Sequence, residues 1–109
     1  MEEQYETKTF DQILLESIDE VLSAIGTSIR GMIYLQLKSR GISKEQIPTR
    51  IDDFSNALQA ILGVGARHIE VHLIKQVQAK TGVTCPFPIQ SSRLSECAVF
   101  IKHEYIKGK

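Results

Sequence analysis

Apolar residues recur at helical spacing in four stretches of this chain, and glycines punctuate the stretches. The first shows the pattern most clearly, with apolar side chains at Phe10, Leu14, Ile18, Val21, Leu22 and Ile25. Residues three, four, seven and eight positions apart share one face of an α-helix, so this stretch predicts an amphipathic helix that ends at Gly26. Because the pattern is repeated, it restricts the fold to a packing of helices.

A second helix is expected from Ile29 to about Arg40. It is apolar over much of its circumference, which is typical of a central and well-buried helix. The segment Ser43–Pro48 then predicts a single capped turn that the proline stops. Thr49 stands three residues before Asp52, a variant of the capping box, and is therefore expected to cap a third helix.

The third predicted helix has its apolar residues at Ile51, Phe54, Leu58, Ile61 and Leu62. A fourth helix is expected from Ala66 to about Lys80, and Pro86 and Pro88 then force an extended linker. The set Leu94, Cys97, Ile101 and Tyr105 again has helical spacing, with a strand as the alternative. We therefore predict an all-α fold with a mobile leader (1–9), a compact bundle of four main helices (10–82), and a Pro-containing linker with a C-terminal appendage (83–109).

Size and charge balance exclude several classes of protein. The 109 residues suffice for one core, and 13 Lys+Arg balance 13 Asp+Glu, which argues against nucleic-acid binding through bulk charge. No signal-peptide pattern is recognised at the N-terminus, and no apolar run approaches the roughly 20 residues that span a bilayer. We therefore expect a soluble cytoplasmic protein without a membrane contact, in which Cys85 and Cys97 are free thiols.

Charge is segregated along the chain although its sum is zero. Residues 1–26 carry a net charge of −6, and the rest of the chain carries +6. The acidic residues of the first helix lie off its apolar stripe and predict a solvated acidic face. The alternative is that they dock against basic residues such as Arg67 and Lys75, within the chain or across a dimer. Arg67 also lies in the first turn of the fourth helix, where a cation is unfavourable, and this makes it a candidate contact residue.

His68 and His72 are the candidate metal ligands. They are four residues apart, which places both imidazoles on one helical face at a separation that suits Zn²⁺ or Ni²⁺. A catalytic zinc site needs three protein ligands and a structural one needs four, so the tail would have to supply the others through Cys85, Cys97 or His103. The alternative is a pair of surface or interface histidines, and no cofactor is predicted.

Enzymatic and DNA-binding functions have weaker support in the sequence. Gly63 and Gly65 precede a helix, but the phosphate-binding fingerprints also need a preceding strand and a third glycine or a lysine, so the glycines are assigned to a sharp turn. No catalytic set has a supporting motif, and no enzyme is predicted. A DNA-binding regulator is kept as an alternative because of a loose basic strip at Arg30, Lys38, Arg40, Lys44 and Arg50. The carboxylates of Asp52 and Asp53, where phosphates would approach, argue against it.

An ordered set of residues resembles a small archaeal family, the Nitrosopumilus-type output domains. The set comprises Leu15–Leu22, Gly26, Ile33–Leu37, Gly41–Ile42, Ile47–Pro48, Phe54, Ala57–Leu58 and Gly63–Arg67, and the similarity covers roughly residues 13–82. The resemblance implies a helical module of archaeal signal transduction, without an enzymatic activity and with an undefined biochemical role. It carries over no site residue.

The sequence thus predicts a non-enzymatic interaction or output module that acts through protein–protein contact, including self-association as a homodimer. The second helix has more apolar residues than a four-helix core needs, and such a surplus is typical of an interface. Tyr34 and Leu35, on a second face of that helix, are the predicted interface residues together with Arg67. A small metal- or ligand-binding domain using His68 and His72, and a DNA-binding regulator, are the alternatives.

Overall fold

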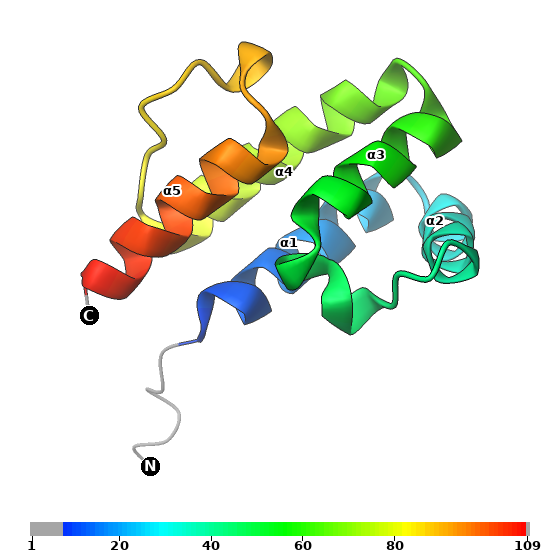
Figure 1. Ribbon diagram of the computed structural model, residues 1–109, viewed down its shortest axis with the longest axis horizontal. Helices are drawn as coiled ribbons and strands as arrows, with labels where there is room; N and C mark the ends of the chain where they lie inside the picture. The colour runs from blue at the N-terminus through cyan, green and yellow to red at the C-terminus, as the bar shows by residue number, and fades with distance from the viewer. Residues whose placement is uncertain (1–7, 109) are drawn as a thin grey trace.

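The computed structural model describes residues 8–108, and no strand occurs within that range (Figure 1). The helices follow in the order α1 (Phe10–Ile25), α2 (Thr27–Ser39), η2 (Lys44–Thr49), α3 (Ile51–Leu62), α4 (Gly65–Thr81), η3 (Ile89–Ser91) and α5 (Leu94–Lys107), where η marks short 3₁₀ helices. The all-α class is confirmed, and the C-terminal segment is a helix rather than a strand. The first seven residues of the expected leader lie outside the described range.

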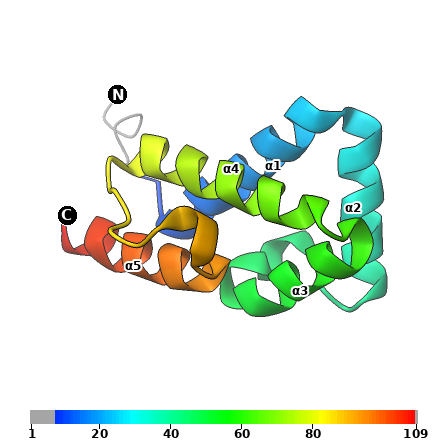
Figure 2. The same ribbon diagram turned by 90° about the horizontal axis from the view of Figure 1, so that it is seen from above.

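Helices α1 and α4 pack against each other at the centre of the molecule, and α3 and α5 both pack on α4. Figure 2 shows α3 and α5 on one side of the α1–α4 pair, with α2 at the end of the molecule remote from α5. Helix α2 contacts α1, α3 and η2. This arrangement leaves one side of α2 and one side of α5 exposed at opposite ends of the fold.

A single hydrophobic core connects the five α-helices. Its largest fully buried side chains include Ile18, Leu22, Phe54, Leu73 and Ile101. Helix α5 contributes through residues that share one face, namely Leu94, Cys97, Ala98 and Ile101. The segment predicted as an appendage therefore packs into the same core as the other helices.

The prediction that the second helix is central and well buried is wrong. In α2 only Ile33 and Leu37 are buried, whereas Leu35 is 69% exposed. The physical reason is angular: Ile33 and Leu37 are one turn apart and face the bundle, and Leu35 lies about 160° away from Leu37 around the helix. Apolar residues thus occur all around α2, but only those on the side that faces the bundle are buried.

Local capping explains where some of the helices begin or end. The Thr9 hydroxyl oxygen accepts the Gln12 N–H at 3.1 Å, and the Gln12 side chain accepts the Thr9 N–H at 2.8 Å, so a capping box starts α1. Gly82 ends α4 in the left-handed conformation, with φ of 75°. The predicted cap at Thr49 is wrong, because Thr49 belongs to η2 and its hydroxyl donates to the Gln46 carbonyl at 3.0 Å.

Candidate functional site

The solvent-facing side of α2 is the most unusual surface of the fold. Nine residues of α2 are exposed; Thr27 and Lys38 lie at the edge of this side, and the other seven, which we call the α2 face, are Ser28, Ile29, Gly31, Met32, Leu35, Gln36 and Ser39. These seven residues are uncharged and Lys38 borders them on the side of Gly31, while Ile29, Met32 and Leu35 are 36%, 39% and 69% exposed. Ile29, Met32 and Leu35 follow each other at three-residue intervals, so they form a continuous apolar strip along the helix.

Gly31 lies in the middle of this face, and nothing in the described part of the chain requires a glycine there. A Cβ atom built at Gly31 meets nothing within 4 Å, and the residue does not adopt a positive φ. A glycine inside a helix costs about 0.5–1 kcal/mol relative to alanine. The absence of a side chain here leaves room for another backbone to approach α2 closely.

Tyr34 lies on the opposite side of α2 and attaches the helix to α1. Its hydroxyl donates to the Asp19 carboxylate at 2.9 Å, and Arg30 and Lys44 lie 3.4 Å from the same carboxylate. Partial burial raises the pKa of Asp19, but the Tyr34 hydrogen bond and the charges of Lys44 and Arg30 outweigh it and lower the pKa overall. Burial, followed by the Asp19 contact, raises the pKa of Tyr34. Of the two predicted interface residues on this helix, only Leu35 therefore belongs to the α2 face.

Arg67, the third predicted interface residue, is committed to contacts within the chain. Its guanidinium donates to the Glu70 carboxylate at 3.0 Å, to the Gln90 carbonyl at 3.3 Å, and to the carbonyls of Ile89 and Ser92. Glu70 is 1% exposed and accepts a second hydrogen bond from the Ser55 hydroxyl. The cluster thus fastens the segment before α5 onto α4, and both carboxylate oxygens of Glu70 are satisfied.

A polar cavity of about 470 Å³ opens beside this cluster, between α3, the start of α4 and the segment before α5. Its lining includes Asn56, Gln59, Arg67, Glu70 and Arg93. Sequence reasoning missed Glu70, although a signal existed. Glu70 occupies the buried face of α4 midway between Ala66 and Ile74, and it follows Arg67 by three residues, the spacing of a helical ion pair.

His68 and His72 lie one turn apart on α4 and line an open groove of about 480 Å³ against α1, together with Glu20. The Glu20 carboxylate already accepts from Gln76 at 2.6 Å and from Lys80 at 3.1 Å, and these hydrogen bonds lower its pKa. Across residues 8–108, no group of three or more His, Cys, Asp or Glu side chains is placed to hold a metal ion. The pair supplies two ligands where a catalytic zinc needs three.

The acidic residues of α1 pair within the chain, but with other partners than the sequence suggested. Asp19 contacts Arg30 and Lys44, and Lys80 lies 3.7 Å from Glu16 and 3.1 Å from Glu20. Arg67 and Lys75, which the alternative prediction named as partners, make none of these contacts. Two cations of the proposed basic strip, Arg30 and Lys44, are thereby engaged by a carboxylate, and Arg50 pairs with Asp53 at 3.0 Å.

Cys85 and Cys97 are both buried free thiols. Burial and a hydrogen bond with Cys85 raise the pKa of Cys97 to about 12, so this thiol stays protonated near neutral pH. The two residues join the segment after α4 to α5 inside the core and act there as small hydrophobic side chains.

Comparison with known proteins identifies no relative. The chain matches no family model, and no curated protein or solved structure is significantly similar to it. Within the part of the chain that the structure describes, no helix combines the length and the apolar character needed to cross a membrane.

Proposed function

We propose that the chain is a non-enzymatic helical interaction module that associates with a second copy of itself through the α2 face. The observation that carries this proposal is the apolar strip of exposed Ile29, Met32 and Leu35 beside Gly31, where no side chain stands in the way of a partner. Contiguous apolar surface on a small domain commonly marks a protein–protein contact.

The attachment of α2 to the rest of the chain supports this use of its outer side. Ile33 and Leu37 are buried against the bundle, and the Tyr34–Asp19 hydrogen bond fixes the orientation of the helix toward α1. The α2 face is therefore presented on a helix whose inner side is anchored, and a partner meets a preformed surface with little to order on binding.

The setting that we propose for the module rests on the resemblance of its sequence alone. The similarity to the Nitrosopumilus-type output domains supports a role in archaeal signal transduction in the cytoplasm, in which a change of association transmits the signal. The histidine pair and the basic strip support the alternatives less well, because the pair has no third metal ligand among residues 8–108 and three of the five cations of the strip are paired with carboxylates.

The test is the molar mass in solution, measured by size-exclusion chromatography with light scattering over a tenfold concentration range. We expect a mass above the 12.2 kDa of one chain that rises with concentration. Leu35→Glu places a charge on the apolar strip and should return the mass to that of one chain. Because Leu35 is 69% exposed, the variant should keep the helical circular dichroism of the wild type.

Val64→Glu is the matched control. Val64 is 94% exposed in the turn between α3 and α4, outside the α2 face, so introducing a glutamate in place of this apolar side chain should leave the mass unaltered. A wild-type chain that stays monomeric over the whole range contradicts the proposal, as does a Leu35→Glu variant that associates like the wild type.

A further inference from the structure

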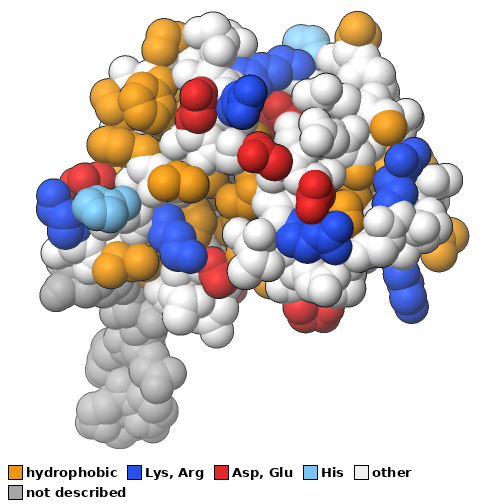
Figure 3. All heavy atoms as spheres, in the orientation of Figure 1, with side chains coloured by type: hydrophobic (Ala, Val, Ile, Leu, Met, Phe, Trp, Pro, Cys, Tyr) orange, Lys and Arg blue, Asp and Glu red, His pale blue; other side chains and the backbone are white. Residues whose placement is uncertain are grey.

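The second exposed apolar surface of the molecule lies on α5, and it is hollowed. A groove of about 860 Å³ runs between α5, the segment before it and the start of α3. We call it the α5 groove and define it by the residues that matter here, Asp52, Phe87, Glu96, Val99, Phe100 and Glu104. In Figure 3, hydrophobic side chains gather over α5 and the segment that precedes it.

The floor of the groove is aromatic and partly open to solvent. Phe87 and Phe100 stack edge to face with ring centroids 5.7 Å apart, and Val99 is 63% exposed beside them. Phe87 itself is 40% exposed, although an aromatic side chain gains most from complete burial. The groove therefore has an apolar surface that the described residues leave exposed to solvent.

The charge around the groove is acidic. Its lining contains Asp52, Glu96 and Glu104 but no lysine or arginine, and its one other titratable side chain, His103, lies 3.8 Å from Glu104. Glu104 also pairs with Lys107 at 3.6 Å. Among the described residues, neither Asp52 nor Glu96 forms an ion pair, although Glu96 accepts the Arg93 backbone N–H at 2.9 Å. Their negative charges can therefore meet a basic partner.

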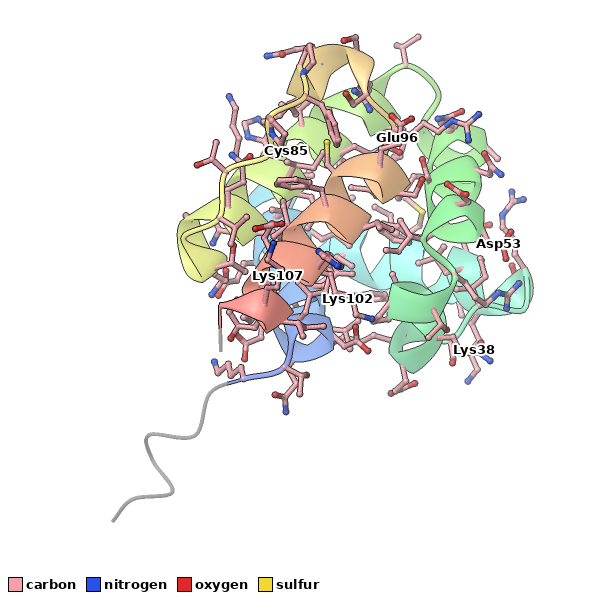
Figure 4. All side chains as sticks on the ribbon, turned by 60° about the vertical axis from the view of Figure 1, so that its left-hand side comes forward. Lys38, Asp53, Cys85, Glu96, Lys102 and Lys107 are labelled. Carbon is pink, nitrogen blue, oxygen red and sulfur yellow. The ribbon has the colours of Figure 1, made fainter. Side chains whose placement is uncertain are left out.

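Helix α2 has the complementary character. Its charged residues are Arg30 and Lys38, Arg40 follows directly as its C-cap, and the helix contains no acid. Lys38 lies one turn after Leu35, and within residues 8–108 neither Lys38 nor Arg40 has an acidic partner. Figure 4 shows Lys38 and Glu96 on separate parts of the surface, so one copy cannot satisfy this complementarity with itself.

We propose that the α2 face of one copy docks into the α5 groove of a second copy, head to tail. This inference rests on the proposed self-association and names the surface that receives α2. Ile29, Met32 and Leu35 would meet the Phe87, Val99 and Phe100 surface, as an amphipathic helix seats its apolar face in a groove. Lys38 and Arg40 would approach the carboxylates of Asp52 and Glu96.

This mode of contact has a consequence that a symmetric α2–α2 pairing does not. A symmetric contact uses the same patch on both copies and stops at a dimer, whereas a head-to-tail contact leaves one free α2 face and one free groove on every pair. Helices α2 and α5 lie at opposite ends of the fold (Figure 2), and the groove extends from α5 to Asp52 at the start of α3. Association therefore continues into a ring or an open chain.

The decisive experiment combines two variants that each lose one surface. Leu35→Glu removes the α2 face, and Val99→Glu puts a charge in the groove; both positions are exposed, and circular dichroism checks that both variants fold. We expect each variant alone to have the mass of one chain. Mixed in equal amounts, they should form a 1:1 pair of twice that mass that grows no further, because the two altered surfaces carry like charges.

The possible outcomes separate this inference from the proposed function. If Val99→Glu associates like the wild type while Leu35→Glu does not, α2 pairs with α2, and the head-to-tail contact is overturned while the proposed function stands. If both variants are monomeric and their mixture remains so, the head-to-tail contact is also overturned. A monomeric wild type removes both proposals.

A milder variant tests the electrostatic part. The Glu96 side chain accepts the Arg93 N–H at 2.9 Å and thereby helps to start α5, so Glu96→Gln keeps an acceptor there while it removes the charge. We expect a roughly two- to fivefold weaker association and a smaller dependence on salt. An association unchanged in both respects would show that acidic charge plays no part and would overturn the complementarity on which the contact rests.

Discussion

Helices α1 and α2 follow each other with a single glycine between them, yet they relate to the core in opposite ways. Helix α1 buries Phe10, Ile13, Leu14, Ile18 and Leu22 and turns its acidic residues outward, where basic side chains of the same chain pair with them. Helix α2 buries two hydrophobic residues and exposes three. Helix α1 exposes one large apolar residue, Ile25 at its end, whereas α2 exposes an apolar strip of three residues that no described residue covers.

The difference shows what hydrophobic patterning does and does not determine. In α1 the apolar and acidic residues alternate with helical period, so only one orientation buries the former and solvates the latter. In α2 both sides are compatible with burial, and the position of the helix in the fold decides which side is used. An apolar circumference indicates either a central helix or a helix with a second partner.

The largest expected effect comes from one substitution made in both helices. Leu22→Ala in α1 removes a side chain that is 1% exposed and should lower the free energy of unfolding by about 3 kcal/mol. Leu35→Ala in α2 removes a side chain that is 69% exposed and should change it by less than about 0.5 kcal/mol. Urea unfolding at a concentration where the chain is monomeric measures both. Similar losses would mean that Leu35 is packed within its own chain, and the contrast between the helices would fail.

A smaller effect is expected from the bond that joins the two helices. Tyr34→Phe removes the hydrogen bond to Asp19 and should cost about 1 kcal/mol near neutral pH. Folding lowers the pKa of Asp19. The ionised carboxylate therefore stabilises the folded chain at pH values above the unfolded pKa, and this stabilisation is lost as the pH falls through the lowered pKa. The difference in the free energy of unfolding between the wild type and Tyr34→Phe should therefore become smaller as the pH is lowered.

The control for this bond is the same change in a chain that lacks the carboxylate. In an Asp19→Asn background, Tyr34→Phe should cost less than in the wild type, and the difference between the two costs is the coupling energy of the pair. Equal costs in the two backgrounds would show that Tyr34 stabilises α2 by packing alone.

The comparison also shows how far the sequence could predict the fold. The helix boundaries follow from local signals, such as the Thr9–Gln12 capping box and the left-handed Gly82, because capping depends on residues a few positions apart. The rotation of α2 about its axis could not be predicted, since it depends on where Asp19 and the core residues of other helices lie. The predicted cap at Thr49 failed for a related reason, because the 3₁₀ helix at 44–49 continues through it.

The candidate site was likewise predictable only in part from the sequence. Leu35 was predicted as an interface residue from the apolar surplus of its helix, and the structure leaves it on the exposed side. Arg67 was singled out for its unfavourable helix position, but its actual partners include three backbone carbonyls of the segment before α5, which no residue pattern specifies. The α5 groove could not be found from spacing, since Asp52 and Phe87 come together only in three dimensions.

The smallest effect is expected at Gly31, where a substitution should stabilise the monomer and weaken association. Gly31→Ala adds a Cβ that meets nothing within 4 Å in the single chain, so the substitution should raise the free energy of unfolding of the monomer by about 0.5–1 kcal/mol. The same methyl group stands where a partner would approach α2, so association, measured by light scattering, should weaken. Gly65→Ala in α4 is the control, because that position is equally open but lies outside both surfaces, and it should leave association unchanged. A Gly31→Ala chain that associates as well as the wild type would show that no close approach occurs at the centre of the α2 face.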